Sequence, residues 1–294
     1  MAVKTKRGLS PIYLDQAEAE DLPLVLPRSG RWRIAFGWYG GKFSHLEWLL
    51  PLLPPSHHYC EPFAGSAAVL LNRAPAPVET YNDVDGEVVN FFRVLRVDSE
   101  GLRRAIALTP FAREEFHIAV AGIERGVSAL EKARRFYVRA RQARTGLAQT
   151  ATLGRWANCR NTSRADMSGV ISRWFGGIEA LADIGERMLR VQIENRPAAD
   201  VIRLYDGPGT LFYCDPPYLH ETRGDSKAYG FEMDEEQHWE LAATLRRIAG
   251  KAAVSGYRCE RMDRLYRGWR RFDAAEKQCH SIKQLRQECL WMNY

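Results

Sequence analysis

The chain has 294 residues, of which 46% are hydrophobic and 27% are charged. This length predicts one large α/β unit or two lobes, and the composition excludes disordered, collagenous and coiled-coil proteins. No apolar run approaches the ~20 residues that cross a bilayer, so we expect no membrane partner and a cytoplasmic location. The six cysteines lie far apart without a Cys-X-X-Cys pair, which predicts free thiols and neither a zinc site nor a disulfide framework.

Positive charge is concentrated in one block of the sequence. The net charge is +6, from 42 Lys and Arg against 36 Asp and Glu, but residues 132–173 contain ten basic residues and one acid, Asp166. Most of the ten are arginines, whose planar guanidinium makes bidentate contacts with phosphate and with guanine. An isolated basic run is usually a solvated helix face, whereas a block of this length favours a polyanion partner. A second basic cluster comprises Arg258, Arg261, Arg264, Arg267, Arg270 and Arg271.

The N-terminal third of the chain predicts an arm followed by a parallel βαβ unit. Residues 1–30 show no periodic pattern, so we expect a mobile or loosely docked arm there. From His57 onward, short apolar runs end in small or acidic residues, which is typical of strands that lead into loops. We expect strands at 58–60 and 78–81, and helices at 66–72 and 85–96.

The rest of the chain predicts a helical insertion inside one α/β domain. To about residue 190, apolar residues recur every three or four positions, with a Gly-, Ser-, Thr- and Asn-rich interruption at 145–169. The β/α pattern then resumes, and we expect a strand at 210–215, a helix at 234–248, a strand at 252–254 and an apolar segment at 289–294. The predicted domains are a catalytic domain at 31–97 and 191–294 and an inserted basic helical domain at 98–190.

The motif Asp215-Pro216-Pro217-Tyr218 follows an apolar strand and therefore falls at the carboxyl edge of the sheet, where open α/β folds bind ligands. Its two prolines lack a backbone donor and have a fixed φ, which stiffens this strand exit. Asp215 and the Pro216 carbonyl can accept the two hydrogens of an amino group on a planar ring, and Tyr218 can stack on that ring. A simple stiff turn would use the same residues, but the place after a buried strand favours substrate binding.

Three separated motifs resemble those of Dam-type (alpha-class, DPPY motif) DNA adenine methyltransferases. They are Trp38-Tyr39-Gly40-Gly41-Lys42, Glu61-Pro62-Phe63-Ala64-Gly65-Ser66 and Asp215-Pro216-Pro217-Tyr218, in that order. The resemblance runs from Phe36 to the C-terminus. It implies an α/β fold: a Rossmann-like S-adenosylmethionine-dependent methyltransferase sheet with an inserted, mainly helical DNA-recognition lobe.

The resemblance also implies the reaction and its partners. S-adenosyl-L-methionine would be the methyl donor and S-adenosylhomocysteine the product, and the methyl group would go to the N6 amino group of a flipped-out adenine in double-stranded DNA. No metal is expected. A bacterial, archaeal or phage origin is implied, and a cognate restriction endonuclease is left open as a partner.

Individual residues receive roles from the same resemblance. Catalytic residues would be Asp215, Pro216 and Tyr218, and the cofactor would be contacted by Trp38, Lys42, Glu61, Phe63, Gly65, Asp83 and Asp215. Asp83 would bind the ribose hydroxyls, and its alternative interpretation is a helix N-cap. The charge pattern gives Arg139, Arg141, Arg144, Arg155, Arg160, Arg164 and Arg173 as candidate DNA contacts. Base-reading arginines are expected between Arg155 and Arg173, in a loop or hairpin.

Two positions depart from the family pattern. Ala67 stands where the family often has a second glycine, which narrows the room for a close backbone approach. Pro197-Ala198 stands where many relatives have an acidic-aromatic pair near the cofactor adenine. The details of the adenine pocket therefore do not carry over. The DNA recognition sequence does not carry over either, because the recognition lobe has only weak likeness to the best-known members of the family.

The chemistry of amino-group methylation explains the residues of the Asp215–Tyr218 motif, but other functions are also compatible with the sequence. An aromatic amine is a poor nucleophile, so two fixed acceptors in a water-poor pocket are needed to direct its lone pair toward the methyl group. The base must first leave the duplex stack. The alternatives are methylation of the cytosine amino group, methylation of a glutamine side-chain amide, and a catalytically silent DNA-binding protein. Asp215 favours adenine, the basic block favours nucleic acid, and the retained motifs favour an active enzyme.

Overall fold

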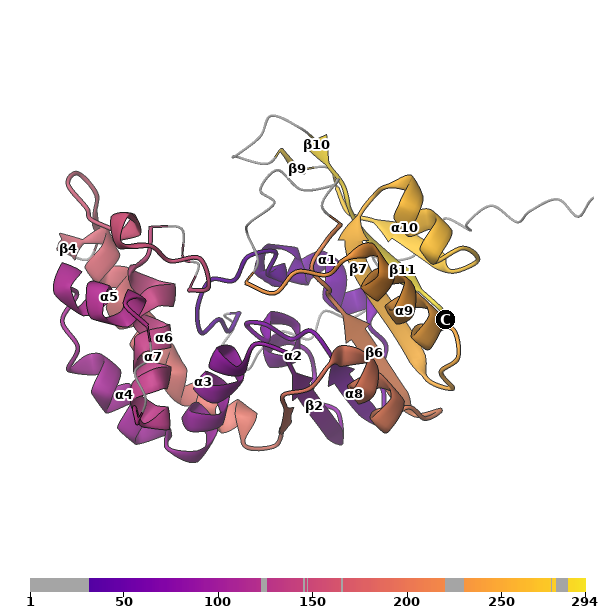
Figure 1. The fold of residues 1–294 in the computed structure, drawn as a ribbon, viewed down its shortest axis with the longest axis horizontal. Coiled ribbons are helices and arrows are strands. Elements are labelled where there is room, and N and C mark those ends of the chain that lie inside the picture. Colours follow the sequence, from indigo (N-terminus) through magenta and orange to yellow (C-terminus); the bar gives the residue numbers. More distant parts are fainter. Residues whose placement is uncertain are drawn as a thin grey trace, which may run out of the picture.

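A computed structural model describes residues 32–122, 126–144, 146, 148–164, 166–219, 230–275, 277–278 and 285–294. The predicted N-terminal arm, residues 1–30, lies outside the described residues. The described residues form a seven-stranded sheet between helices, with a group of further helices beside one edge (Figure 1). None of the helices in this part of the chain has the length and apolar character needed to span a membrane.

The sheet is mostly parallel and has the order β5-β2-β1-β6-β7-β11-β8. The pairs from β5 to β7 are parallel, whereas β11 is antiparallel to both of its neighbours, β7 and β8. This arrangement confirms the predicted Rossmann-like α/β class. The strands are β1 (His58–Glu61), β2 (Val78–Asn82), β5 (Gln192–Glu194), β6 (Thr210–Cys214), β7 (Lys251–Tyr257), β8 (Arg270–Asp273) and β11 (Glu288–Met292).

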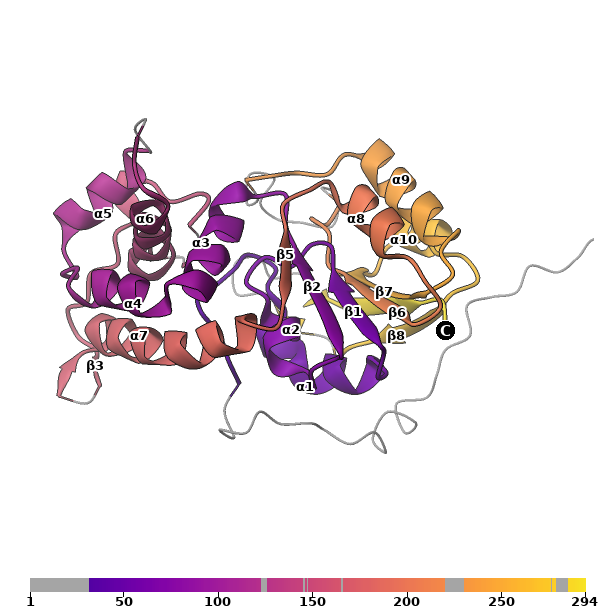
Figure 2. The same cartoon turned by 90° about the horizontal axis from the view of Figure 1, so that it is seen from below.

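Both faces of the sheet are buried. Successive residues of a strand point to opposite faces, so each strand contributes side chains to both. In β6, Leu211 and Tyr213 belong to one hydrophobic cluster, and Phe212 and Cys214 belong to the other. Helices α1 and α2 cover the first face, and α8, α9 and α10 cover the second (Figure 2). Their bounds are α1 (Leu46–Leu49), α2 (Ala68–Asn72), α8 (Ala198–Tyr205), α9 (Glu235–Leu245) and α10 (Glu260–Leu265).

Helices α3 to α7 lie together beyond the β5 edge of the sheet (Figures 1 and 2). Their aromatic residues join the cluster of the first sheet face. The ring centroid of Phe36 lies 5.2 Å from that of Phe91 and 5.1 Å from that of Phe136. Arg187 of α7 also forms a buried ion pair with Glu79 of β2. The helices are α3 (Gly86–Val97), α4 (Ser99–Ala107), α5 (Arg113–Val120), α6 (Ala129–Gln142) and α7 (Gly169–Met188).

Short elements complete the described chain. The segment between α6 and α7 contains a two-stranded hairpin, which lies at the outer end of the helical group (Figure 2). The short elements are η2 (Lys42–His45), η3 (Leu50–Leu52), η4 (Leu153–Arg155), β3 (Ser163–Arg164), β4 (Met167–Ser168), β9 (Lys277–Gln278) and β10 (Leu285–Arg286).

Acidic side chains pair with several arginines of the second basic cluster, at 258–271. Arg271 is buried in β8 and forms ion pairs with Asp263 at 2.5 Å and Asp273 at 2.8 Å. Arg261 pairs with Glu235. The acids that neutralise these arginines are partly outside the cluster, so their proximity could not be read from local charge counting.

Candidate active site

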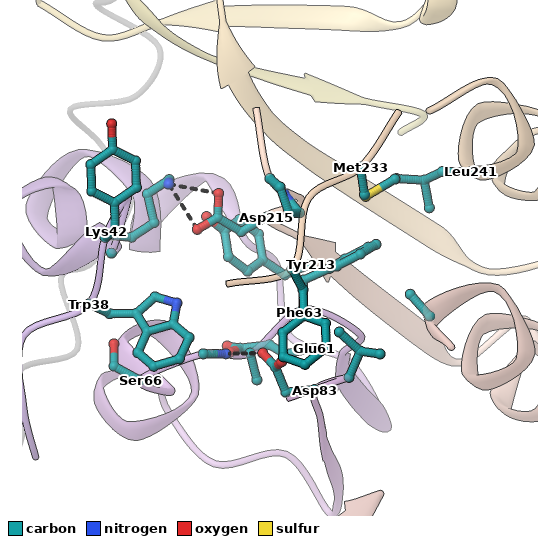
Figure 3. A pocket seen from close by; sticks show the side chains of 18 of the residues that line it. Trp38, Lys42, Glu61, Phe63, Ser66, Asp83, Tyr213, Asp215, Met233 and Leu241 are labelled. Atoms are coloured by element: carbon teal, nitrogen blue, oxygen red, sulfur yellow. Dashed lines mark hydrogen bonds and ion pairs between the residues drawn. The ribbon is translucent and has the colours of Figure 1, made fainter. Parts of the chain in front are cut away.

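The carboxyl ends of three adjacent parallel strands bring the predicted site residues together. Cys60 in β1 lies opposite Thr80 in β2 and Phe212 in β6, so these strands end at one edge of the sheet. Glu61 is the last residue of β1, Asp83 follows β2 and Asp215 follows β6. All three carboxyl groups line a single cavity of about 340 Å³ (Figure 3).

Lys42 and Asp215 form a buried ion pair in the wall of this cavity. The Lys42 Nζ atom lies 2.7 Å from Asp215 Oδ1 and 2.8 Å from Oδ2, and it also donates to the Gly40 carbonyl at 2.6 Å (Figure 3). Burial lowers the pKa of Lys42, but the carboxylates of Asp215 and Glu288 outweigh this effect and raise it above its usual value. The lysine therefore stays charged and fixes the position of Asp215, whose pKa is raised by burial although Lys42 acts to lower it.

Asp83, which follows the neighbouring strand β2, forms a hydrogen bond with the turn after β1. Its Oδ2 accepts from the Gly65 backbone N–H at 2.8 Å (Figure 3), and its Oδ1 accepts from the Asp85 N–H at 2.9 Å. The N-cap of α3 is Asp85, which accepts from the Glu87 N–H, so the N-cap interpretation of Asp83 is wrong. Burial raises the pKa of Asp83 to about 6.

The turn from Gly65 to Ala67 passes directly under Trp38. Gly65 has φ +47°, and a Cβ at this position would lie 2.4 Å from Trp38 Nε1, so both the backbone and the ring require glycine. Ala67 has φ 56°, and it therefore keeps the left-handed conformation although it carries a side chain. The departure at Ala67 is thus accommodated by the backbone at a cost of about 1–2 kcal/mol.

Gly65→Ala is expected to lower the free energy of unfolding by about 1–3 kcal/mol, because the new methyl group adds backbone strain and collides with Trp38. Denaturant unfolding measures this change. Gly176→Ala is the control, since Gly176 lies in α7 with no atom within 4 Å of the added Cβ. The control should raise stability by about 0.5–1 kcal/mol. Equal effects of the two substitutions would contradict the role given to Gly65.

The cavity contains all of the residues predicted to contact the cofactor. These are Trp38, Lys42, Glu61, Phe63, Gly65, Asp83 and Asp215. Glu61 accepts a hydrogen bond from the Tyr59 hydroxyl at 2.7 Å, and burial raises the pKa of Glu61 to about 8. Pro197 and Ala198, the two residues that differ from the family pattern, also line the cavity. They give it an apolar wall without a charged side chain.

Sequence reasoning missed several residues of the cavity wall. Tyr213 from β6, Met233 and Leu241 line it, and so does Gln149, which comes from the segment between α6 and α7. The alternation in β6 could have identified Tyr213, because it lies two residues before Asp215 and shares its side of the strand. Nothing local in the sequence marks Gln149, since its place depends on the packing of the helical group.

Pro216 and Tyr218 lie next to the main cavity and do not line it. Both face a second, small cavity. Tyr218 is 5% exposed, its ring packs edge-on against Tyr257 with centroids 4.8 Å apart, and its hydroxyl donates to Glu288. The predicted stacking of Tyr218 on a substrate ring therefore requires the ring to be uncovered first.

The arginines of the basic block differ in their surroundings. Arg139 is buried, pairs with Glu87 at 2.7 Å and donates to the Ala119 carbonyl, so it is not part of the exposed surface of the block. Arg141 is half-buried and donates to the Arg173 carbonyl. The exposed arginines are Arg144, Arg155, Arg160, Arg164 and Arg173.

Acids outside the block neutralise part of its charge. Glu131 pairs with Arg134 and Arg135, and Glu115 also pairs with Arg134. Among the described residues, the ion pairs of the block belong to Arg134, Arg135 and Arg139, which leaves the exposed arginines as its available positive surface. Arg164 lies in the β3–β4 hairpin, within the segment expected to contain base readers.

No cluster of three or more His, Cys, Asp or Glu side chains in the described segments is placed to hold a metal ion. The family model for D12 class N6 adenine-specific DNA methyltransferases matches residues 38–287. This range begins at Trp38 and includes every cavity residue discussed above as well as the helical group. No curated protein matches the chain at a significant level.

Proposed function

Because the chain belongs to the D12 class N6 adenine-specific DNA methyltransferase family, we propose that its main cavity binds S-adenosyl-L-methionine and that Asp215 receives the target adenine. The observation that supports this most directly is the convergence of three motifs, far apart in sequence, on one cavity at the carboxyl edge of the sheet. The reaction of the family is methylation of adenine in DNA. The match therefore favours adenine over the cytosine and glutamine alternatives.

The residues present fit this cofactor chemically. Its ammonium and sulfonium groups are positive, and the cavity offers the carboxyl groups of Glu61 and Asp215. Its ribose hydroxyls need acceptors, which Asp83 can supply beside its two backbone hydrogen bonds. Its adenine ring needs apolar walls, which Phe63, Pro197 and Leu241 can supply. When bound, S-adenosylmethionine supplies an activated methyl group on sulfur.

Asp215 would act as a fixed acceptor for the adenine amino group. Its carboxylate is 18% exposed at the cavity, and Lys42 fixes its orientation through both oxygens. A preorganised carboxylate in a site that excludes water can hold an amino hydrogen more strongly than solvent does. The Pro216 carbonyl would accept the second hydrogen, and Tyr218 would stack on the base after DNA binding uncovers it. We keep Asp215, Pro216 and Tyr218 as the proposed catalytic residues.

The helical segment at 98–190 would be the target-recognition domain, inserted into a catalytic domain at 31–97 and 191–294. Its exposed arginines include Arg164, which belongs to the β3–β4 hairpin at the outer end of the helical group (Figure 2). A two-stranded ribbon is narrow enough for the major groove of duplex DNA. We propose that Arg155, Arg160, Arg164 and Arg173 contact DNA, with base reading at the hairpin.

Incubation of the full chain with tritiated S-adenosylmethionine and mixed-sequence duplex DNA tests the proposed function. We expect label in N6-methyladenine after the DNA is digested to nucleosides. Label in methylcytosine or in protein, or no transfer at all, would contradict it. Methylation-sensitive sequencing of DNA from an expressing host would then give the target sequence, and a restriction endonuclease blocked at that sequence would be the candidate cognate partner.

We expect the affinity for S-adenosylmethionine to rise with pH up to about 8, because Glu61 is protonated below its raised pKa of about 8 in the free protein. The positive cofactor favours the ionised carboxylate, so binding releases a proton. Below pH 8 the affinity should therefore increase by up to about tenfold per pH unit and then level off. Titration calorimetry in buffers of different ionisation enthalpy measures both the affinity and the proton release.

Glu61→Gln is the control for this pH dependence, because the amide keeps the shape of Glu61 but cannot ionise. It should bind the cofactor more weakly at high pH and show a flatter pH profile. An affinity that falls or stays constant as pH rises in the wild-type protein would contradict the assignment of Glu61 to the cofactor site.

A further inference from the structure

We propose that Glu288 is a positioning residue of the active site. It holds the side chains of Lys42 and Tyr218 in the positions that methyl transfer at Asp215 requires. This inference rests on the proposed function of the main cavity. Glu288 lies outside the three motifs, in the strand β11 near the C-terminal end of the described chain. It does not line the main cavity, so it would act through its neighbours.

Glu288 is a buried carboxylate whose described side-chain partners belong to the active site. It is 5% exposed, its Oε1 lies 3.5 Å from Lys42 Nζ, and the Tyr218 hydroxyl donates to the same oxygen. In the sheet, Glu288 lies opposite Tyr257, the residue against which the Tyr218 ring packs. One carboxyl oxygen of Glu288 thus contacts both the lysine and the aromatic residue of the motif.

The arrangement places one ammonium between two carboxylates. Lys42 Nζ contacts both oxygens of Asp215, lies near Glu288, and is 4.9 Å from the centre of the Tyr218 ring. A buried carboxyl group costs several kcal/mol unless it is paired. The described side-chain partners of Glu288 are Lys42 and Tyr218, so its burial restrains two side chains of the active site.

Loss of Glu288 would release two constraints at once. Lys42 would keep Asp215 as its near carboxylate and could move, and the Tyr218 hydroxyl would lose its hydrogen bond to Glu288. The orientation of Asp215 follows that of Lys42, and a displacement of about 1 Å in a reacting group can cost about 100-fold in rate. The effect should therefore fall on the methyl-transfer step and not on cofactor binding.

The test compares Glu288→Ala and Glu288→Gln with wild type in single-turnover methyl transfer from tritiated S-adenosylmethionine. We expect Glu288→Ala to slow transfer by about 10- to 100-fold with cofactor affinity close to wild type. Glu288→Gln should be several-fold faster than Glu288→Ala, because its amide oxygen can still accept from Tyr218. If Glu288→Ala does not fold, the comparison of Glu288→Gln with wild type carries the test.

Glu79→Gln is the matched control for a merely structural effect. Glu79 is also a buried carboxylate, but it pairs with Arg187 of α7 and does not line the cavity. Its substitution should lower the melting temperature and leave the rate of the folded enzyme unchanged. A cycle of Glu288→Ala with Tyr218→Phe should show less than additive losses in rate, because both remove the same hydrogen bond.

Three results would overturn the inference: wild-type rates in both Glu288 variants, losses explained entirely by the fraction of folded protein, or fully additive losses in the cycle. The proposed function fails separately, namely if the wild-type protein itself transfers no methyl group to adenine. A wild-type enzyme that is active, with Glu288 variants that are equally active, would remove only the role of Glu288.

Discussion

Asp215→Asn is expected to reduce single-turnover methyl transfer by at least about 10²- to 10³-fold, while the cofactor and DNA still bind with reduced affinity. The amide has the shape of the carboxylate, but it can turn a donor toward the adenine amino group where an acceptor is needed. It also removes the charge that holds Lys42 at 2.7 Å. Transfer of tritium from S-adenosylmethionine to DNA measures the rate, and calorimetry measures the remaining cofactor affinity.

Asp215→Ala should abolish transfer and also destabilise the protein. It leaves Lys42 buried without its nearest carboxylate, and breaking a buried pair from one side typically costs about 3–5 kcal/mol. Comparison of the two variants separates the loss of the acceptor from the loss of packing and charge. Near wild-type turnover in either variant would contradict the role of Asp215.

Replacement of Arg155, Arg160, Arg164 and Arg173 by alanine is expected to make DNA binding less dependent on salt. Each lost phosphate contact reduces the slope of log affinity against log salt by ~0.9, so four contacts would reduce it by up to ~3.6. Loss of a base-reading arginine should instead cost about 1–3 kcal/mol at the cognate site and relax sequence preference there. Binding titrations at several salt concentrations, with cognate and mixed-sequence duplexes, distinguish phosphate contacts from base-reading contacts.

Arg135→Ala is the matched control for these substitutions. Arg135 belongs to the same basic block, but its guanidinium is paired with Glu131 at 2.8 Å. The control should leave the salt slope unchanged, and cofactor affinity should stay unchanged in all of these variants. If the quadruple variant kept the wild-type slope, the assignment of the helical group to target recognition would be wrong.

The sequence was sufficient to predict the centre of the fold and the cavity. The apolar runs of β1, β2 and β6 were recognisable, and parallel strands bring the residues that follow them to one edge. The helices α2, α3 and α9 were also recognised within a few residues of their bounds. By contrast, β5 is a three-residue edge strand with a partly polar sequence, so it lacks the apolar run by which strands are recognised.

Long-range partners account for the burial of residues whose surroundings the local sequence did not predict. Arg139 was assigned to the basic surface, although it lies three residues after Phe136 and one before Ala140, on the buried stripe of α6. Its partner Glu87 is 52 residues away, and no local count of charge includes it. Glu288 was missed for the same reason, because it precedes the apolar run at 289–292 and is 70 residues from Tyr218. An acid at the start of a buried strand was the available signal.

The order of strands in the sheet also constrains how the chain can fold. β8 pairs only with β11 among the described strands, although β11 follows it in the chain. β8 can therefore join the sheet only together with β11 or after it, because β11 lies between β8 and β7. Glu288 is part of β11, so Lys42 and Tyr218 gain their contacts with this carboxyl group only when β11 has joined the sheet. Assembly of the site would then be completed in the same step that completes the sheet.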